Sequence, residues 1–341
     1  MNKYWFYKVG LVVVFLCFAL LGGAKVKLPT LVSDGMVLQR GEPVNIWGTA
    51  DPDETVDITF LKKKYKTVAD VQGNWKVTLP ILKAGGPYTM AINDIELKDI
   101  LIGDVWVCSG QSNMELPVSR VTDRFRDEIS TDSNYSMVRY IKTPLLYNFH
   151  APQADIPGIS WQAMTPENVM PFSALAYFFA KDVYQKTKVP VGIINSSVGG
   201  SPVEAWISEG GLKPFPFYLN EKRIYESDDL MESMKKEERK KSHAWNVALF
   251  QGDKGMHEAT PWYAADYDDS NWTETDLFTS GWATNGLNTV NGSHWFRKDF
   301  QVSAQQAGEK ATLRLGCIVD ADSVYVNGTF VGTVSYQYPP R

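Results

Sequence analysis

Short runs of alternating apolar and polar residues fill the chain between an apolar leader and about residue 98. The clearest runs cover residues 44–47, 55–60, 75–79 and 88–92, and Gly, Pro and Asn separate them. Alternation with a period of two, cut by turn-forming residues, is typical of short antiparallel strands. The pattern therefore predicts an N-terminal β-sandwich domain over residues 25–98.

From residue 99 to about residue 257 the pattern becomes that of an α/β domain. The apolar runs at residues 102–108, 138–141 and 189–195 suit strands that are buried on both faces. The side chains of residues 172–187 separate into faces at helical spacing, which predicts a helix between the last two strands.

This strand-helix-strand unit has a consequence for chemistry, because connected parallel strands end at the same edge of a sheet. Ser173, or the Pro171-Phe172 corner just before it, is suited to begin the helix. The strand after the helix runs into Gly199 and Gly200. These glycines are therefore expected at the sheet edge where the first strand, residues 102–108, also ends.

The last third of the chain is expected to differ again. Residues 221–242 are dense in charge and predict an exposed helix without a chemical role. Residues 258–341 return to β character, and Asn327-Gly328 predicts a hairpin because it supplies the two positive φ angles of a type I′ turn. We expect an incomplete third domain of β-sandwich type.

The first 24 residues have the pattern of a secretory signal peptide. Lys3 and Lys8 supply positive charge, residues 9–21 are nearly all apolar, and Gly22-Gly23-Ala24 offers small residues for cleavage. The apolar run is shorter than the roughly 20 residues that a membrane span needs. We therefore expect export to the periplasm or the extracellular space, with no membrane span after the leader is removed.

Composition excludes several other classes of protein. The 44% hydrophobic and 21% charged residues are ordinary for a globular protein, and the net charge of -5 gives no basic surface for nucleic acid. Cys17 lies in the leader, while Cys108 and Cys317 fall in different expected domains, so no disulfide framework is predicted. The four histidines show no metal-type spacing, and no metal or other cofactor is expected.

The candidate nucleophile is Ser112, which follows the apolar strand of residues 102–108 by a few small and polar residues. Open α/β sheets place their chemistry at the carboxyl ends of strands. Met114 stands where the Gly-x-Ser-x-Gly elbow of α/β-hydrolases requires glycine, so another serine-hydrolase family is indicated. The alternative is that Ser112 only caps the helical segment after it.

With Cys108-Ser109-Gly110-Gln111-Ser112-Asn113-Met114 in view, the chain resembles the sialate O-acetylesterase family, a branch of the SGNH hydrolases. The resemblance runs from about residue 26 to the end, and its signatures are residues 34–40, 85–88, 103–114, 172–174 and 199–206. It implies an α/β fold with a flavodoxin-like, three-layer SGNH core at residues 99–257. A galactose-binding-like β-sandwich, residues 258–341, would be inserted into this core.

The resemblance also implies a mechanism and a substrate. Ser112 would attack an acetyl ester on sialic acid or a related glycan. Its backbone N–H, with that of Gly199 or Gly200, would form the oxyanion hole. A histidine and an aspartate from a later Asp-x-x-His segment would complete the triad.

The chain departs from the family pattern in its acid-base partners. None of the four histidines has an aspartate three positions before it. Gln251-Gly252-Asp253 resembles a later Gln-Gly-Glu motif of the family, but we interpret it as an unrelated linker sequence. We expect the chain to be the N-terminal portion of a longer esterase, with little activity alone.

Two other functions fit the same sequence. One is deacetylation of plant polysaccharides such as acetylated xylan. The other is a secreted carbohydrate-binding protein without catalysis, in which two β-sandwiches flank an inactive α/β remnant.

Overall fold

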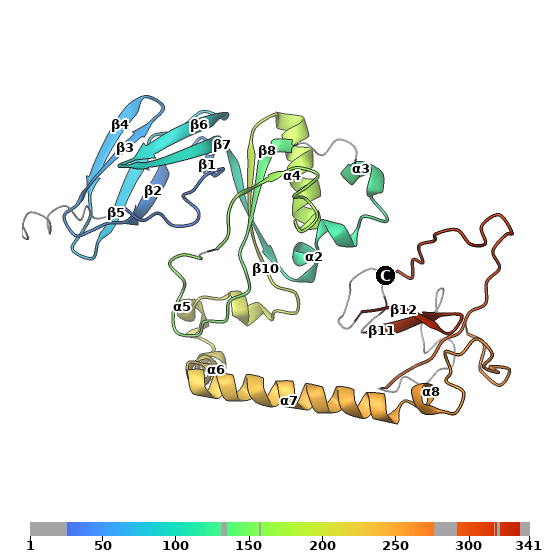
Figure 1. The fold of residues 1–341 in the computed structure, drawn as a ribbon. Coiled ribbons are helices and arrows are strands. Elements are labelled where there is room, and N and C mark those ends of the chain that lie inside the picture. The colour runs from blue at the N-terminus through green and yellow to red at the C-terminus, as the bar shows by residue number, and fades with distance from the viewer. Residues whose placement is uncertain are drawn as a thin grey trace, which may run out of the picture. The chain divides into compact units, whose positions relative to one another are not determined.

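The computed structural model describes residues 26–130, 135–156, 158–275, 292–316, 318 and 321–334 (Figure 1). The chain divides into two compact units between Asn220 and Glu221. The expected signal peptide, residues 1–24, and Cys317 lie outside the described residues. No helix within the described ranges combines the length and the apolar character needed to cross a membrane.

The first unit begins with short strands in two sheets. In the larger sheet β3 pairs antiparallel with β4 and with β6, and in the smaller sheet β2 pairs antiparallel with β5. The strands are β1 (Val37–Gln39), β2 (Val44–Thr49), β3 (Thr55–Phe60), β4 (Lys63–Val68), β5 (Asn74–Leu79) and β6 (Gly85–Ile92). The four runs of alternating residues therefore all form strands, as predicted. Strand β4, whose lysine-rich residues are mostly exposed, was not predicted from the sequence.

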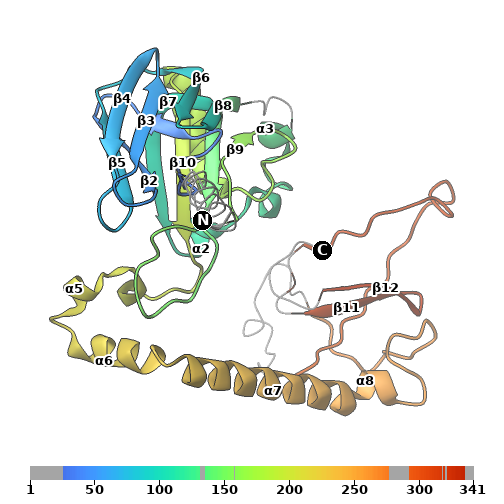
Figure 2. The ribbon, with the colours of Figure 1, turned by 60° about the vertical axis from the view of Figure 1, so that its left-hand side comes forward.

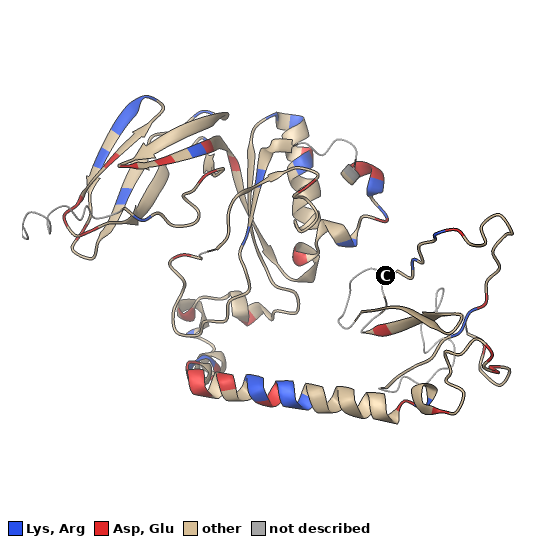
Figure 3. Cartoon of the chain, in the orientation of Figure 1, with Lys and Arg blue, Asp and Glu red and all other residues tan. Residues whose placement is uncertain are grey.

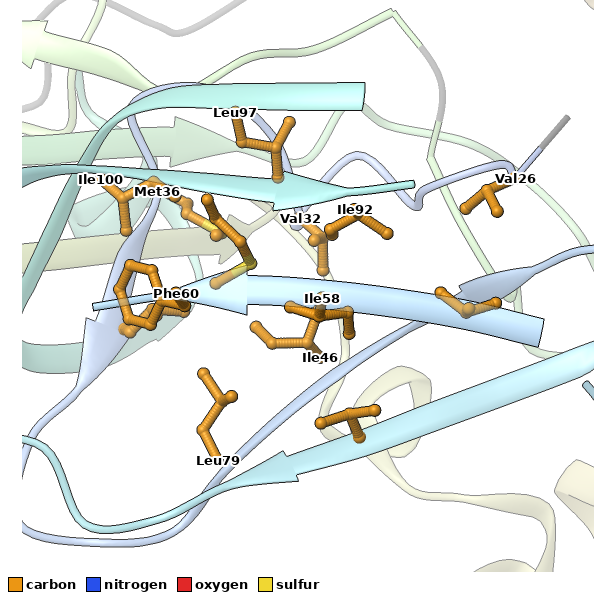
Figure 4. Packing of buried hydrophobic residues seen from close by; sticks show 14 of the residues in the cluster. Val26, Val32, Met36, Ile46, Ile58, Phe60, Leu79, Ile92, Leu97 and Ile100 are labelled. Atoms are coloured by element: carbon orange, nitrogen blue, oxygen red, sulfur yellow. The ribbon is translucent and has the colours of Figure 1, made fainter. Parts of the chain in front are cut away.

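One hydrophobic core joins these two sheets (Figure 4). Ile46 and Leu79 come from the smaller sheet, while Ile58, Phe60 and Ile92 come from the larger one, and all five are almost fully buried. Burying an aliphatic or aromatic side chain of this size stabilises a fold by about 1.5–3 kcal/mol. Alternate residues of each strand thus hold the two sheets face to face.

Strand β7 (Ile95–Gly110) is 16 residues long and belongs to both halves of the first unit. Its first part pairs antiparallel with β6, and Leu101 to Gly103 pair parallel with β1. From Asp104 to Gly110 it pairs parallel with β10 (Val191–Ser197). The expected boundary between residues 98 and 99 therefore lies inside a continuous strand.

The second half of the first unit is α/β. Strand β10 also pairs parallel with β8 (Tyr135–Lys142), and β9 (Gln162–Met164) pairs antiparallel with β8. Helix α4 (Ala174–Thr187) packs on β8 and β10, and the Ser173 side chain caps it by accepting a hydrogen bond from the Ala176 N–H at 3.2 Å. The predicted helix and its start are confirmed.

The sheet order in the described residues is β4-β3-β6-β7-β10-β8-β9. This is a central mixed sheet, and it confirms the α/β class. A flavodoxin-like sheet places its first parallel strand between the second and the third. Here β10, the third, lies between β7 and β8, so the structure differs from that finer prediction.

Short helices fill the connections of the first unit. They are α2 (Ser112–Glu115), η1 (Val118–Arg120), α3 (Arg126–Ser130), η2 (Val203–Trp206), α5 (Glu209–Leu212) and α6 (Pro216–Tyr225), the last of which ends beyond Asn220.

The second unit contains α7 (Asp228–Gly252), α8 (Lys254–His257), β11 (Asp322–Val326) and β12 (Thr329–Val334). Charged residues gather in the first half of α7 (Figure 3). The helix continues past the predicted end at Ser242, so Gln251 and Gly252 are helical and the linker interpretation was wrong. In the described residues between 258 and 321 no strand forms.

The predicted hairpin is confirmed. Strands β11 and β12 pair antiparallel across Asn327 and Gly328, whose φ angles are 48° and 80°. A type I′ turn needs positive φ at both central residues.

A close backbone contact fixes β7 where it passes from one half of the first unit to the other. A Cβ atom added to Gly103 would lie 1.9 Å from the Pro190 carbonyl oxygen. That carbonyl accepts a hydrogen bond from the Asp104 N–H at 2.9 Å. The Asp104 carboxylate in turn accepts from the Arg40 guanidinium at 2.8 and 3.0 Å.

We predict that Gly103→Ala destabilises the first unit. The added methyl group must push the β7 and Pro190 backbones apart, and overpacking of this kind costs typically about 1–3 kcal/mol. Urea unfolding monitored by circular dichroism measures the loss. Gly210→Ala is the control, because a Cβ there meets only the Ser208 Oγ at 3.9 Å. Equal stability of the two variants would contradict the prediction.

Candidate active site

Ser112 is the first residue of α2, directly beyond the carboxyl end of β7 (Figures 1 and 2). Gly110 ends the strand with a φ of 138°, a value that favours glycine. Ser112 is exposed, and its hydroxyl forms no hydrogen bond with any described residue. The side chain is therefore open to a molecule from solvent.

The end of β10 lies beside this serine, as the strand-helix-strand pattern predicted. Ser197 is the partner of Gly110 in the sheet, and the Val198 N–H donates to the Gly110 carbonyl at 3.0 Å. A Cβ atom added to Gly199 would lie 3.5 Å from both Cα and Cβ of Ser112. Glycine at position 199 lets the backbone come this close to the serine.

Residues 198–201, which we call the glycine loop, are held in place by hydrogen bonds with side chains of α2, its N-cap residue and η2. The Gly199 N–H donates to the Glu115 carboxylate at 2.5 Å. The Gln111 amide donates to the Ser201 carbonyl, and the Trp206 indole N–H donates to the Ser201 hydroxyl at 2.9 Å. From the sequence Glu115 was expected to form a local hydrogen bond, but its partner lies 84 residues away along the chain.

These contacts distinguish the two glycines that were candidates for an oxyanion hole. The Gly199 N–H is occupied by Glu115. The N–H groups of Gly200 and Ser112 donate no hydrogen bond to any described residue. Gly200 also has a φ of 76° and space around its Cα, which suits a backbone that meets a ligand.

The Asn195 side chain of β10 links α2 to the sheet by hydrogen bonds. It is fully buried, and its amide donates to the Cys108 carbonyl at 3.3 Å and to the Met114 carbonyl at 3.5 Å. The Ser197 hydroxyl donates to the Asn195 side-chain oxygen at 3.0 Å. A buried amide with these partners fixes the height of α2, and hence of Ser112, above the strands.

Two titratable side chains under the site are neutral at physiological pH. Burial raises the pKa of the Cys108 thiol above its ordinary value, so it does not compete as a thiolate nucleophile. Burial also raises the pKa of Tyr140 to about 12, although the hydrogen bond from the Ser173 N–H acts in the opposite direction. Ser112 is therefore the candidate nucleophile.

Ser112 forms no hydrogen bond with a histidine among the described residues. His150 is exposed in the segment after β8, while His243, His257 and His294 belong to the second unit. The His257 ring lies 2.7 Å from the Phe250 carbonyl oxygen. The described residues also hold no group of side chains suited to a metal ion. The site thus offers a nucleophile and two free N–H donors.

Comparisons with known proteins agree with this geometry. Residues 102–270 match the model of a carbohydrate esterase family described as sialic acid-specific acetylesterase. Sialate O-acetylesterase from Homo sapiens is 33% identical over 213 residues, which are 56% of this chain and 40% of the relative. Sialate O-acetylesterase from Rattus norvegicus is 31% identical over 230 residues, 60% of this chain and 42% of the relative.

A solved structure is similar as well. A carbohydrate acetylesterase from Xanthomonas citri, described as novel, superposes with a TM-score of 0.52 at 39% sequence identity. The match covers 55% of this chain and 43% of that one, so this chain spans less than half the length of its relatives. Over residues 102–270, the chain belongs to the carbohydrate esterase family of sialic acid-specific acetylesterases, homologous to sialate O-acetylesterases.

Proposed function

We propose that this chain supplies the nucleophilic half of an exported serine esterase that removes O-acetyl groups from sialic acid or related acetylated glycans. The observation that carries the proposal is the exposed Ser112 at the end of β7, with the glycine loop packed against it. Within this proposal residues 99–257 are the first half of an SGNH domain. Residues 25–98 form a β-sandwich ahead of it, and residues 258–341 begin an inserted galactose-binding-like domain.

The proposed reaction begins with attack of the Ser112 Oγ on the acetyl carbonyl carbon. A base takes the serine proton, and the carbonyl oxygen becomes an oxyanion that accepts from the Ser112 and Gly200 N–H groups. Collapse of this intermediate breaks the bond to the sugar oxygen, which takes the proton from the base and becomes a hydroxyl. The acetyl group remains on Ser112 as an ester. Water then hydrolyses that ester and releases acetate.

In this mechanism Gly199 has a different task from Gly200. Because its N–H donates to Glu115, it holds the glycine loop in place rather than binding the oxyanion. Glu115 is therefore a positioning residue, and Gly200 is the second oxyanion donor. A preorganised donor of this kind contributes typically about 2.7–4 kcal/mol to the stability of the transition state.

The general base and its carboxylate partner are proposed to lie outside these 341 residues. No described hydrogen bond joins Ser112 to a histidine. The relatives extend well beyond the part of their length that this chain matches. A serine without its base is a weak nucleophile at neutral pH.

We predict that Ser112→Ala abolishes acetate release from O-acetylated N-acetylneuraminic acid by the protein as its gene encodes it. Loss of a catalytic serine costs about 10⁶ in kcat in the subtilisin example. Ser119→Ala is the control, since Ser119 is an exposed serine close by in the same segment. Full activity of Ser112→Ala would rule out the mechanism.

The same assay separates the alternative functions. Faster acetate release from acetylated xylan than from the acetylated sialic acid would assign the enzyme to plant polysaccharides. Binding of either glycan with no acetate release would favour the non-catalytic carbohydrate-binding protein.

We predict that Glu115→Ala lowers kcat roughly 10²-fold, because the freed glycine loop no longer holds Gly200 in position, and a small misplacement can cost this much. Glu115→Gln keeps an oxygen that accepts from Gly199 and is expected to retain most of the activity. Steady-state kinetics with both variants distinguish the cases. If Glu115→Gln is as impaired as Glu115→Ala, the carboxylate has a role other than holding the loop.

We also predict that the 341-residue chain alone hydrolyses acetyl esters at about 10⁻⁶ of the rate of the complete enzyme, as for loss of a catalytic histidine. Acetate release at equal protein concentration measures the ratio. A fully active, Ser112-dependent chain would place the base within these residues.

A further inference from the structure

A shallow groove of about 230 Å³ lies at the carboxyl end of β8, and the proposed mechanism makes no use of it. Its polar side chains are Lys142, Ser160, Gln162 and Tyr140. One wall is Phe172, whose ring stacks on Tyr140 with the centroids 4.1 Å apart.

The strand that carries Lys142 is connected through β10 to the helix that carries Ser112. In the sheet Lys142 of β8 is the register partner of Asn195 of β10. Asn195 is in turn the register partner of Cys108 of β7. Neighbours in register point to the same face of a sheet, and Asn195 contacts the Met114 carbonyl of α2 from that face.

The wall of the groove leads to the same helix. The Val118 N–H, just beyond α2, donates to the Phe172 carbonyl at 2.8 Å. The Ala174 N–H donates to the Leu116 carbonyl, also at 2.8 Å. The groove wall at Phe172 is therefore hydrogen-bonded to the segment that directly follows α2.

Lys142 brings a positive charge that the described protein does not neutralise. It is half-buried, and its ammonium group forms no ion pair or hydrogen bond with any described residue. A cation partly withdrawn from water is stabilised by an anionic partner.

The neighbouring groups are also donors. The Ser160 hydroxyl accepts from the Gln162 amide at 2.7 Å, which leaves its own proton free to donate into the groove. The Tyr140 hydroxyl accepts from the Ser173 N–H at 3.0 Å and keeps its proton at neutral pH. A cation among hydroxyl donors is complementary to a carboxylate.

We propose that Lys142 binds the carboxylate of an acidic sugar in this groove, with help from Ser160, and so selects acetylated sialic acids over neutral acetylated sugars. The proposal rests on the proposed esterase function and adds a specificity-determining residue to it. Lys142 takes no part in bond breaking, so its effect falls on substrate binding.

The test uses the protein as its gene encodes it and two substrates that differ in one charge. They are O-acetylated N-acetylneuraminic acid and its C1 methyl ester, which carries the same acetyl group without the carboxylate. Lys142→Met is expected to raise KM for the acid about 10-fold to 100-fold, as for loss of a hydrogen bond to a charged group. We expect kcat for the acid and both constants for the methyl ester to stay nearly unchanged.

Two further variants support the interpretation. Lys142→Arg keeps the charge and is expected to restore KM to within a few-fold. Lys76→Met removes an exposed lysine from β5, which belongs to a different sheet from β8, and is expected to change nothing. An equal rise in KM for the acid and the methyl ester, or none for either, would overturn the proposal and leave Lys142 as a solvated lysine.

Titration of free N-acetylneuraminate into the Ser112→Ala variant separates this proposal from the esterase mechanism. Binding that Lys142→Met weakens at least 10-fold supports the carboxylate site, even if no acetate is released from any substrate. Binding that is unaffected by Lys142→Met overturns the site, even if the esterase activity is confirmed.

Discussion

The passage of strand β7 through two sheets is the constraint on which the first unit depends. One continuous strand pairs antiparallel with β6 and then parallel with β10. The change of partner occurs between Gly103 and Asp104, and the Pro190 backbone approaches Gly103 too closely for any side chain there. Arg139 of β8 adds a second tie, because its buried guanidinium binds the Asp99 carboxylate in the first part of β7 at 2.6 and 2.9 Å. The N-terminal strands thereby determine the position of the strand that leads to Ser112.

The geometry around Ser112 follows from that strand and its neighbour. Parallel pairing of β7 and β10 sets Gly110 beside Ser197, so the next residues of both strands meet above the same edge. Two side chains then hold these segments in place. The Glu115 carboxylate accepts from the Gly199 N–H, and the Asn195 amide donates to the Met114 carbonyl. Preorganised N–H groups at such a place need no rearrangement when charge develops on the substrate, which is the main source of their catalytic effect.

Local signals in the sequence predicted the elements well. Ser173 marked the start of α4, Asn327-Gly328 marked the hairpin, and the apolar runs marked β8 and β10. Strand β4 was missed because its residues are largely polar and its pairing with β3 decides its conformation. The end of α7 was missed because its charged half stops near Ser242 while an uncharged half continues the helix.

The site was predictable in part. Ser112 and the glycines follow apolar strands, and that local pattern predicted that they meet at one edge of the sheet. The hydrogen bond between Glu115 and Gly199, the order of β7, β10 and β8, and the groove at Lys142 join residues distant in sequence, and no local pattern reports such contacts.

Covalent labelling tests the central claim most directly. The protein as its gene encodes it would be treated with a fluorophosphonate, which phosphonylates activated serine hydroxyls, and its peptides would be mapped by mass spectrometry. The account predicts one modified serine, Ser112, with loss of acetylesterase activity in proportion to labelling. Inactivation with the adduct on another residue, while Ser112 stays unmodified, would contradict it.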